Sequence, residues 1–329
     1  MTHPFSQNIW NLSENELAAL LDSGNLKPIA SAVRFYAPSF TYYKTRYYCS
    51  SSTDFPTVSV TGTTCTLKCK HCGGKVLETM HPAISPEKLF RVCTEFKDAG
   101  ARGCLVSGGC LPDGSVPLSG FVDTLGRIKR ELDLTVFVHS GILGKKTAFL
   151  LGQTGVDAVL LDVIGSAQTI RRVYNLKVRP QDYSRSMAAL SEARVPFVPH
   201  VIVGLNMGKL DGELAALQMI RQFNPSALVI IAFMPIRGTA MEKTPPPRPL
   251  DIAKTIATAR IMFPQTPLVL GCMRPKGRSR DETDLYALKA GVDAIAFPSE
   301  QAVKHAENRG FKTSFSSYCC AQIYMDLSH

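Results

Sequence analysis

Residues 57–72 read TVSVTGTTCTLKCKHC. A short β-branched, apolar run passes directly into a loop that carries Cys65, Cys69 and Cys72 in C-x₃-C-x₂-C spacing. One loop of this length can wrap three thiolates around an iron–sulfur cluster, and a four-iron cluster that faces three cysteines keeps one iron open. The stretch therefore predicts a strand that ends at a metal-binding loop.

Strand-like and helix-like segments alternate from Thr57 onward. The helix-like segments carry good start signals, such as Ser85 as N-cap with Pro86 at the first helical position. Near-continuous apolar strands that alternate with helices indicate a parallel sheet covered on both faces. Eight strands fit an α/β fold of the (β/α)8 TIM-barrel type, and a doubly wound open sheet is the alternative because strand count does not decide closure. The expected strands are 57–62, 103–107, 134–139, 157–163, 196–203, 227–233, 267–271 and 292–297.

Three segments are expected along the chain. Residues 1–56 form an N-terminal extension, helical after the capping-box pair Ser13 and Glu16 and then aromatic-rich. Residues 57–310 form the barrel, and residues 311–329 form a C-terminal tail over the reactive face. In a barrel that face lies where the strands end and the following loops begin.

The composition indicates a globular cytoplasmic protein. The chain starts without a basic-then-apolar leader, and its longest apolar run, 227–236, is about half of the ~20 residues that a membrane-spanning helix needs. Ten cysteines in a reducing compartment favour metal or catalytic thiols over disulfides. The net charge is +10, but the basic residues are scattered, so we expect neither a nucleic acid nor a membrane as partner.

The cysteine triplet closely resembles the signature of radical S-adenosylmethionine (SAM) enzymes, in which an aromatic residue usually precedes the last cysteine; His71 stands there. The resemblance implies a [4Fe–4S] cluster whose open iron binds SAM, and a 5′-deoxyadenosyl radical formed when an electron enters the sulfonium. A structural zinc site of the three cysteines and His71 is the alternative. Zinc sites more often use paired C-x₂-C elements far apart in the chain.

Residues at the ends of later strands fall in register with the same family. The second strand ends at Ser107, Gly108 and Gly109, which match the segment that holds the amino group of SAM. Cys110 follows where the family usually has glutamate. By the same resemblance, the other cofactor-binding candidates are His139 and Ser140 after the third strand, Asp162 for the ribose hydroxyls, and Ile202 and Gly204 for adenine.

Two narrower resemblances cover most of the chain. Residues 227–275 resemble the last barrel strands of biotin synthase. Residues 166–187 resemble lipoyl synthase, whose V-R-P run matches 178–180, and the serine-serine-tyrosine at 316–318 matches a segment in which a serine of lipoyl synthase caps an auxiliary cluster. The common lipoyl synthase also has an N-terminal three-cysteine motif, where this chain has only Cys49. The combination looks like one component of the two-protein lipoyl synthase of archaea and some bacteria.

This resemblance implies a second, sacrificial iron–sulfur cluster. A set of thiols without metal is the alternative. Arg179, inside the V-R-P run, and Arg274, which aligns with an arginine near the auxiliary cluster of biotin synthase, are the candidate catalytic residues. The expected ligands of the second cluster are Cys49, Cys272, Cys319 and Cys320.

The resemblance also implies the reaction, which is sulfur insertion at C6 or C8 of an octanoyl chain on a carrier protein. The carrier would be a lipoyl domain or the glycine cleavage H protein; such carriers are commonly acidic, so the charge of +10 would assist docking. A sister radical SAM subunit and an electron donor such as ferredoxin or flavodoxin are the other expected partners. Two alternatives stay open: a radical isomerase or lyase that acts on a small molecule without an auxiliary cluster, and a non-catalytic iron–sulfur or zinc scaffold.

Overall fold

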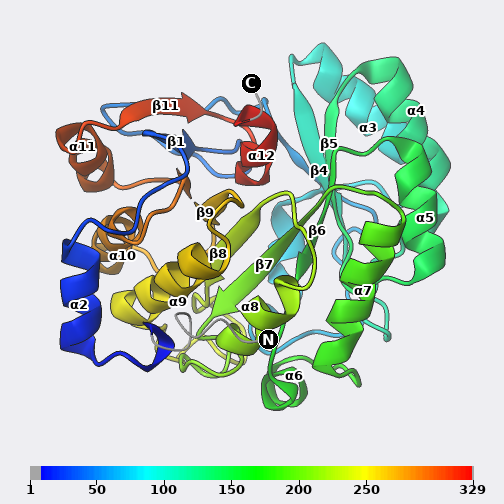
Figure 1. Ribbon diagram of the computed structural model, residues 1–329. Coiled ribbons are helices and arrows are strands. Elements are labelled where there is room, and N and C mark those ends of the chain that lie inside the picture. Colours follow the sequence, from blue (N-terminus) through cyan, green and yellow to red (C-terminus); the bar gives the residue numbers. More distant parts are fainter. Residues whose placement is uncertain (1–8, 328–329) are drawn as a thin grey trace.

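The computed structural model describes residues 9–327, and the apolar runs of this part of the chain pair into one sheet of eleven parallel strands (Figure 1). All eight expected strands are present and take consecutive places in the sheet. Their order is β10 (Ala294–Ala296), β9 (Leu268–Leu270), β8 (Leu228–Ala232), β7 (Phe197–Val203), β6 (Ala158–Asp162), β5 (Thr135–His139), β4 (Gly103–Ser107) and β2 (Thr57–Ser59).

Three further strands extend this series at its two ends. β1 (Ala32–Tyr36) pairs with β10 and with β11 (Lys312–Ser316), and β3 (His81–Pro82) pairs with β2. Within residues 9–327 the edge strands β3 and β11 do not pair with each other, so the sheet is a curled, partly open barrel. The expected TIM-type α/β fold is confirmed, and the segments before residue 57 and after residue 310 each supply a strand to it.

Helices cover the outer face of the curled sheet (Figure 1). The start signals act as expected, since the Ser85 hydroxyl accepts a hydrogen bond from the Lys88 amide and Ser13 forms a capping box with Glu16. The helices are α2 (Glu14–Asp22), α3 (Pro86–Asp98), α4 (Val122–Leu132), α5 (Lys145–Thr154), α6 (Ala167–Val173), α7 (Pro180–Glu192), α8 (Glu213–Ile220), α9 (Pro249–Met262), α10 (Arg278–Lys289), α11 (Glu300–Asn308) and α12 (Ile323–Asp326), with 3-10 turns at η1 (Lys75–Thr79), η2 (Leu118–Phe121) and η3 (Cys320–Gln322).

The concave side of the sheet has its own apolar layer. Side chains alternate between the two faces of a strand, so every second residue points inward. The C-terminal tail enters this layer, and the hydroxyl of Tyr324 donates to the carbonyl oxygen of Asp157, just before β6 (2.6 Å). The inner layer contains Phe137, Leu160, Val198, Val229 and Val269 from the sheet, and Cys320, Ala321 and Ile323 from the tail.

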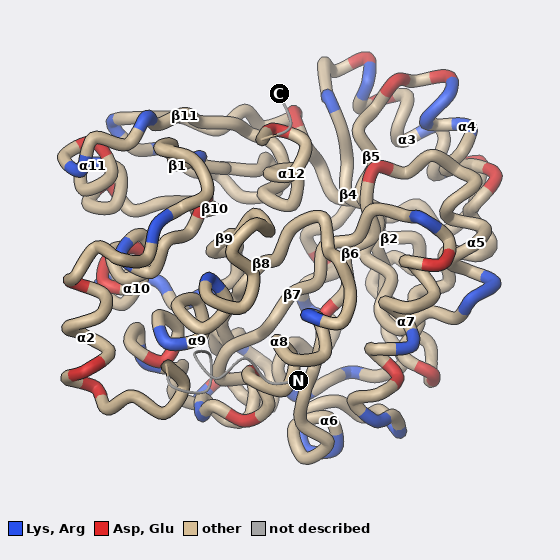
Figure 2. The backbone as a smooth tube through the Cα atoms, viewed as in Figure 1, with Lys and Arg blue, Asp and Glu red and all other residues tan. Residues whose placement is uncertain are grey.

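Most charged side chains lie on the surface, and the buried ones include the ion pairs Arg260–Asp293 and Arg274–Asp284. Basic and acidic positions are interspersed along the outer helices and loops (Figure 2). In the part of the chain that the structure describes, no helix is both long enough and apolar enough to cross a bilayer.

Candidate active site

The three-cysteine loop begins at the carboxyl end of β2 and is fixed by two other segments. The amide of Thr66 donates to the carbonyl oxygen of Cys110 (3.0 Å), which follows β4. The amide of Lys70 donates to the carbonyl oxygen of Val173 at the end of α6 (2.9 Å), and the side-chain amide of Asn175 donates to that of Leu67 (2.7 Å). The loop is therefore held between the end of β4 and the end of α6.

The thiols of this loop interact with each other. A hydrogen bond between the Cys69 and Cys72 sulfurs lowers the pKa of Cys72, and the neighbouring His71 lowers it further. The same hydrogen bond, together with burial, raises the pKa of Cys69. The pair therefore shares one proton and presents a thiolate, which is the form that binds metal.

The backbone of Gly109 leaves room for nothing larger than glycine beside Cys65. A Cβ atom at Gly109 would lie 2.0 Å from the carbonyl oxygen of Thr64 and 2.6 Å from the Cα of Cys65. The Gly109 amide donates to the Thr61 hydroxyl (2.7 Å), which fixes the turn. The glycine at the end of β4 thus lets the cysteine loop lie directly against this strand end.

This arrangement fits an iron–sulfur cluster. Within residues 9–327, no three His, Cys, Asp or Glu side chains are close enough together to ligate one metal ion. A [4Fe–4S] cluster does not require this, because each thiolate binds a different iron. His71 lies against the ring of Tyr174 (5.1 Å between centroids), and its Nδ1 is buried without a hydrogen-bond partner in the described chain. A polar atom beside the thiols is thus left free to face a bound group.

A polar cluster lies at the ends of the next three strands. His139 ends β5, Asp162 ends β6 and His200 lies in β7; each is two residues beyond a side chain of the inner apolar layer, so all three point to the concave side. The Nε2 of His139 is 3.6 Å from an Asp162 carboxylate oxygen, and the His139 and His200 rings are 5.9 Å apart. Together they form a polar rim above the apolar layer.

Burial and neighbouring charges together set the protonation states of the rim residues Asp162 and His200. Burial tends to raise the pKa of Asp162, but the interactions with His139, His200 and His71 together outweigh it and lower that pKa overall. Burial lowers the pKa of His200 to about 4 against the opposing charge of Asp162. At neutral pH the rim therefore holds a carboxylate beside a neutral His200, and the carboxylate can accept hydrogen bonds from hydroxyl groups of a ligand.

We expect His200 to make the metal-free protein acid-sensitive. Because its pKa is about 4 in the folded chain and near 6.5 when exposed, the unfolded chain binds a proton first, and stability falls as the pH drops from about 6.5 to about 4. The loss is about 3 kcal/mol. Urea unfolding at pH 6.5 and at pH 4 should show a smaller loss of unfolding free energy for His200→Gln than for the wild type. His81→Gln, which changes an exposed ring, should keep the wild-type dependence; an unchanged loss in His200→Gln contradicts the assignment.

The structure brings most of the predicted cofactor-binding residues to one edge of the sheet. The Ser107 hydroxyl donates to the carbonyl oxygen of His139 (3.2 Å), which links the ends of β4 and β5. Ser140 is buried, and its hydroxyl donates to the Gly141 carbonyl oxygen (2.9 Å), so it supports the turn after β5. Ile202 shares the concave face with His200, two residues earlier in β7.

The turn after β7 is held by buried polar groups. Gly204 has a positive φ of 73°, and a Cβ there would lie 2.6 Å from Pro247. Its amide donates to Glu213 (2.8 Å), which also accepts from the Asp211 amide (2.7 Å). Burial raises the pKa of Glu213 to about 7. Gly204 therefore has a conformational role that a larger residue would not fill.

Comparison with known families decides the superfamily. Residues 59–212 match the model of the radical SAM superfamily, and residues 229–317 match the biotin and thiamin synthesis associated domain. Residues 59–212 therefore form a radical SAM domain, followed by a biotin and thiamin synthesis associated domain. Radical SAM proteins use a [4Fe–4S] cluster and SAM, in agreement with the cysteine loop and the rim described above.

The curated relatives of this radical SAM protein include a deazariboflavin synthase and biotin synthases. It is 23% identical over 254 residues to 7,8-didemethyl-8-hydroxy-5-deazariboflavin synthase of Methanopyrus kandleri, covering 70% of this chain and 74% of the relative. It is 26% identical over 246 residues to biotin synthase of Synechococcus sp., covering 72% and 77%. These relatives support a biotin synthase-like family and do not support lipoyl synthase specifically.

Solved structures agree on the fold. Methylornithine synthase has a TM-score of 0.62 at 16% identity, covering 94% of this radical SAM chain and 93% of that one. HydG, a maturase of the [FeFe]-hydrogenase, has a TM-score of 0.64 at 17% identity, covering 98% and 73%.

The C-terminal cysteines of the radical SAM chain lie on the concave side. A hydrogen bond between the Cys319 and Cys320 sulfurs lowers the pKa of Cys319 and raises that of Cys320. Burial and the nearby Cys319 charge raise the pKa of Cys272 to about 11. The structure thus brings Cys272 close to the C-terminal pair, whereas Cys49 is exposed and its thiol points to the Ser50 carbonyl oxygen (3.9 Å).

The segment that carries Cys49 nevertheless touches the tail. The hydroxyls of Tyr48 and Ser317 are 2.7 Å apart, and the Ser51 amide donates to the Ser317 hydroxyl (3.3 Å). Ser317 therefore ties this exposed loop to the residues just before Cys319.

The two candidate arginines have different surroundings. Arg274 is fully buried and donates to Asp284 (2.8 Å) and to the carbonyl oxygens of Gly271, Ala296 and Phe297, which occupy four of its five N–H groups. These bonds make it a brace between the ends of β9 and β10. Arg179 is exposed at the start of α7, where its backbone amide donates to Asp182 (2.8 Å).

Two residues near these sites were not predicted. His200 stands inside an apolar strand, and its two-residue spacing from Val198 was the signal that placed it on the inner face. Arg280 has a buried Nε without a hydrogen-bond partner in the described chain, and burial with the nearby Arg274 lowers its pKa to about 10. The buried Nε of Arg280 is thus a donor without a partner near Cys272.

Proposed function

We propose that this radical SAM protein inserts sulfur into an unactivated C–H bond of an octanoyl chain on a carrier protein. The observation that carries the proposal is the position of Cys319 and Cys320, which the tail places on the concave side of the barrel close to Cys272. Three thiols in one partly buried place suit a second iron–sulfur cluster that serves as the sulfur donor. The biotin synthase-like relatives support sulfur chemistry in this family.

The concave side has the right character for an alkyl substrate. Its floor is apolar, and its polar groups are confined to the rim at the strand ends. Cys65, Cys69 and Cys72 would hold the SAM cluster, which with SAM would supply a 5′-deoxyadenosyl radical to remove one hydrogen atom from the acyl chain. The cluster at Cys272, Cys319 and Cys320 would supply the sulfide and take up the electron released as the C–S bond forms. The residues of this chain would hold the acyl chain against Leu160 and Val198, exclude water, and keep Asp162 ionised for the ribose hydroxyls.

The proposed partners follow from the substrate. An octanoyl chain borne by a lipoyl domain or glycine cleavage H protein can reach into the barrel from the rim. The net charge of +10 favours an acidic carrier, and the electrons would come from a one-electron donor such as ferredoxin or flavodoxin. A sister radical SAM subunit would perform the second insertion.

Iron analysis tests the proposal. After anaerobic reconstitution, chemical analysis should find about eight irons and as many sulfides per wild-type chain, and about four of each in Cys319→Ala/Cys320→Ala. Mössbauer spectroscopy should identify the iron as [4Fe–4S] clusters. Cys93→Ala/Cys104→Ala is the matched control, since it removes two buried, hydrogen-bonded thiols at α3 and β4. If wild type and the C-terminal double variant both bind about four irons, the second cluster is absent. A radical isomerase or lyase would then explain the site.

A further inference from the structure

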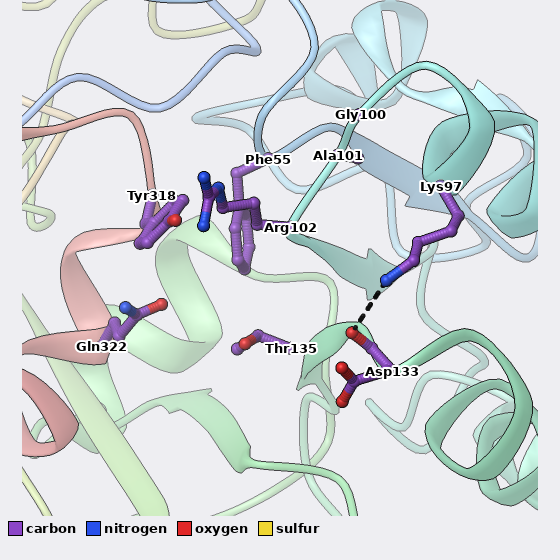
Figure 3. Close-up of a pocket in the computed structure, with 9 residues that line it drawn as sticks. All are labelled: Phe55, Lys97, Gly100, Ala101, Arg102, Asp133, Thr135, Tyr318 and Gln322. Carbon is purple, nitrogen blue, oxygen red and sulfur yellow. Dashed lines mark hydrogen bonds between the residues drawn. The ribbon is translucent and has the colours of Figure 1, made fainter.

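A cavity of about 500 Å³ lies at the end of the barrel opposite the cysteine loop (Figure 3). Arg102 directly precedes β4 and Thr135 begins β5, so the cavity is formed at the amino ends of the parallel strands. Tyr318 and Gln322 of the C-terminal tail form the other wall. The cysteine loop follows the carboxyl end of β2, so this cavity is separate from the SAM site.

Two aromatic rings line the cavity. Phe55 is almost fully buried and packs so closely on Gly103 that a Cβ there would lie 2.4 Å from the Phe55 ring. Tyr318 faces Phe55 with 6.3 Å between the ring centroids and 48° between the planes. The two rings pack on each other in a tilted arrangement and give the cavity an apolar side (Figure 3).

Gln322 presents an unsatisfied acceptor to this cavity. Its side chain is only 8% exposed, and its amide nitrogen donates to Asp326 (3.0 Å). Its carbonyl oxygen Oε1 is buried and has no hydrogen-bond partner among the described residues. A buried acceptor without a donor is unfavourable, so this oxygen can accept a hydrogen bond from water or from an N–H or O–H group of a molecule in the cavity.

Arg102 supplies an unpaired cation at the same cavity. Its guanidinium lies beside Phe55 and Tyr318 in Figure 3, and among residues 9–327 no ion pair or side-chain hydrogen bond engages it. The acidic side chain of the wall, Asp133, lies on the Lys97 side, where the Lys97 ammonium donates to the Asp133 carbonyl oxygen (3.5 Å). The planar fork of Arg102 is therefore free to pair with a carboxylate.

We propose that this cavity binds a small planar carboxylic acid that also carries a hydroxyl or N–H donor. Its carboxylate would pair with Arg102, its planar body would lie along Phe55 and Tyr318, and its donor would reach the Oε1 of Gln322. Within residues 9–327 the exposed Arg102 side chain has no ion pair and the Gln322 Oε1 has no hydrogen bond, and such a ligand supplies both partners together. The evidence for this site does not rest on the sulfur-insertion proposal, although Tyr318 and Gln322 flank the candidate cluster ligands Cys319 and Cys320 in the chain.

Ligand-observed NMR titration of the whole protein tests the site with three probes. 4-Hydroxybenzoate carries both groups, benzoate lacks the donor, and 4-hydroxybenzyl alcohol lacks the charge. 4-Hydroxybenzoate should bind about tenfold more tightly than either of the others. Arg102→Gln should weaken the binding of 4-hydroxybenzoate and of benzoate about tenfold. Arg91→Gln, which changes an exposed arginine on α3, should leave the affinity for both acids unchanged.

Gln322→Met separates the proposed contact from general disturbance of the tail. The variant keeps the size of the side chain but removes the acceptor. The affinity for 4-hydroxybenzoate should therefore fall to that for benzoate, while the affinity for benzoate stays unchanged. Loss of the bond to Asp326 would affect both acids equally, and such an equal loss would overturn the proposal. Absence of 4-hydroxybenzoate binding at about 10 mM, as for a cavity that holds only water, or binding that neither variant alters, would also overturn it.

Discussion

Cys72→Ala should abolish cleavage of SAM. The thiol of Cys72 is the one that the hydrogen bond from Cys69 and the neighbouring His71 hold as a thiolate, so its removal takes away the ligand best prepared for iron. Without a complete three-cysteine loop the cluster cannot keep one iron open for SAM. We expect 5′-deoxyadenosine formation by the dithionite-reduced protein to fall by a factor on the order of 10³ or more.

The iron bound by the three-cysteine loop is best measured in a protein that lacks the second cluster. Cys72→Ala is therefore placed in the Cys319→Ala/Cys320→Ala background, where iron should fall from about four per chain to near zero. Cys110→Ala is the matched control, because Cys110 lies beside the loop and contributes its backbone carbonyl to Thr66. It should keep iron and activity. A Cys72→Ala protein that retains iron and still cleaves SAM would show that the triplet is not the cluster site.

The strands that sequence predicts are those whose apolar side chains are buried on both faces. β8 is a continuous apolar run and β6 is apolar up to its last residue, Asp162, so their composition alone separates them from helices and loops. β11 contains Lys312, Thr313 and Ser314 and has exposed positions at the edge of the sheet. It is a strand because β1 pairs with it, and that partner lies about 280 residues away in the chain.

The same distinction applies to the site. The cysteine loop is local in sequence, so its spacing alone predicts it. The environment of Arg274 depends on Asp284, ten residues later, and on Phe297 at the end of another strand, and no pattern near Arg274 indicates that these will occupy its donors. Alignment places an arginine at the end of β9, but only the packing shows that Arg274 is a brace and that Arg280 is left unsatisfied.

Gly109→Ala should separate the geometry of the loop from its chemistry. The added methyl would lie 2.0 Å from the Thr64 carbonyl oxygen and 2.7 Å from the Cβ of Cys65, so it meets backbone that cannot move without displacing the cysteines. The cost of such overpacking is about 3 kcal/mol or more. We expect a lower urea midpoint and the loss of most loop iron although every cysteine is still present.

Two other glycines provide graded controls for this prediction. At Gly108 a Cβ would lie 3.1 Å from the Thr61 and Val60 side chains, a contact that a small movement relieves. Gly108→Ala should therefore have an iron content and a urea midpoint between those of the wild type and Gly109→Ala. At Gly120, in η2, a Cβ would meet nothing within 4 Å, and Gly120→Ala should match the wild type in iron content and unfolding. Wild-type iron in Gly109→Ala would mean that the loop can leave the end of β4 and still hold its cluster. The close approach of Gly109 to Cys65 would then have no part in forming the site.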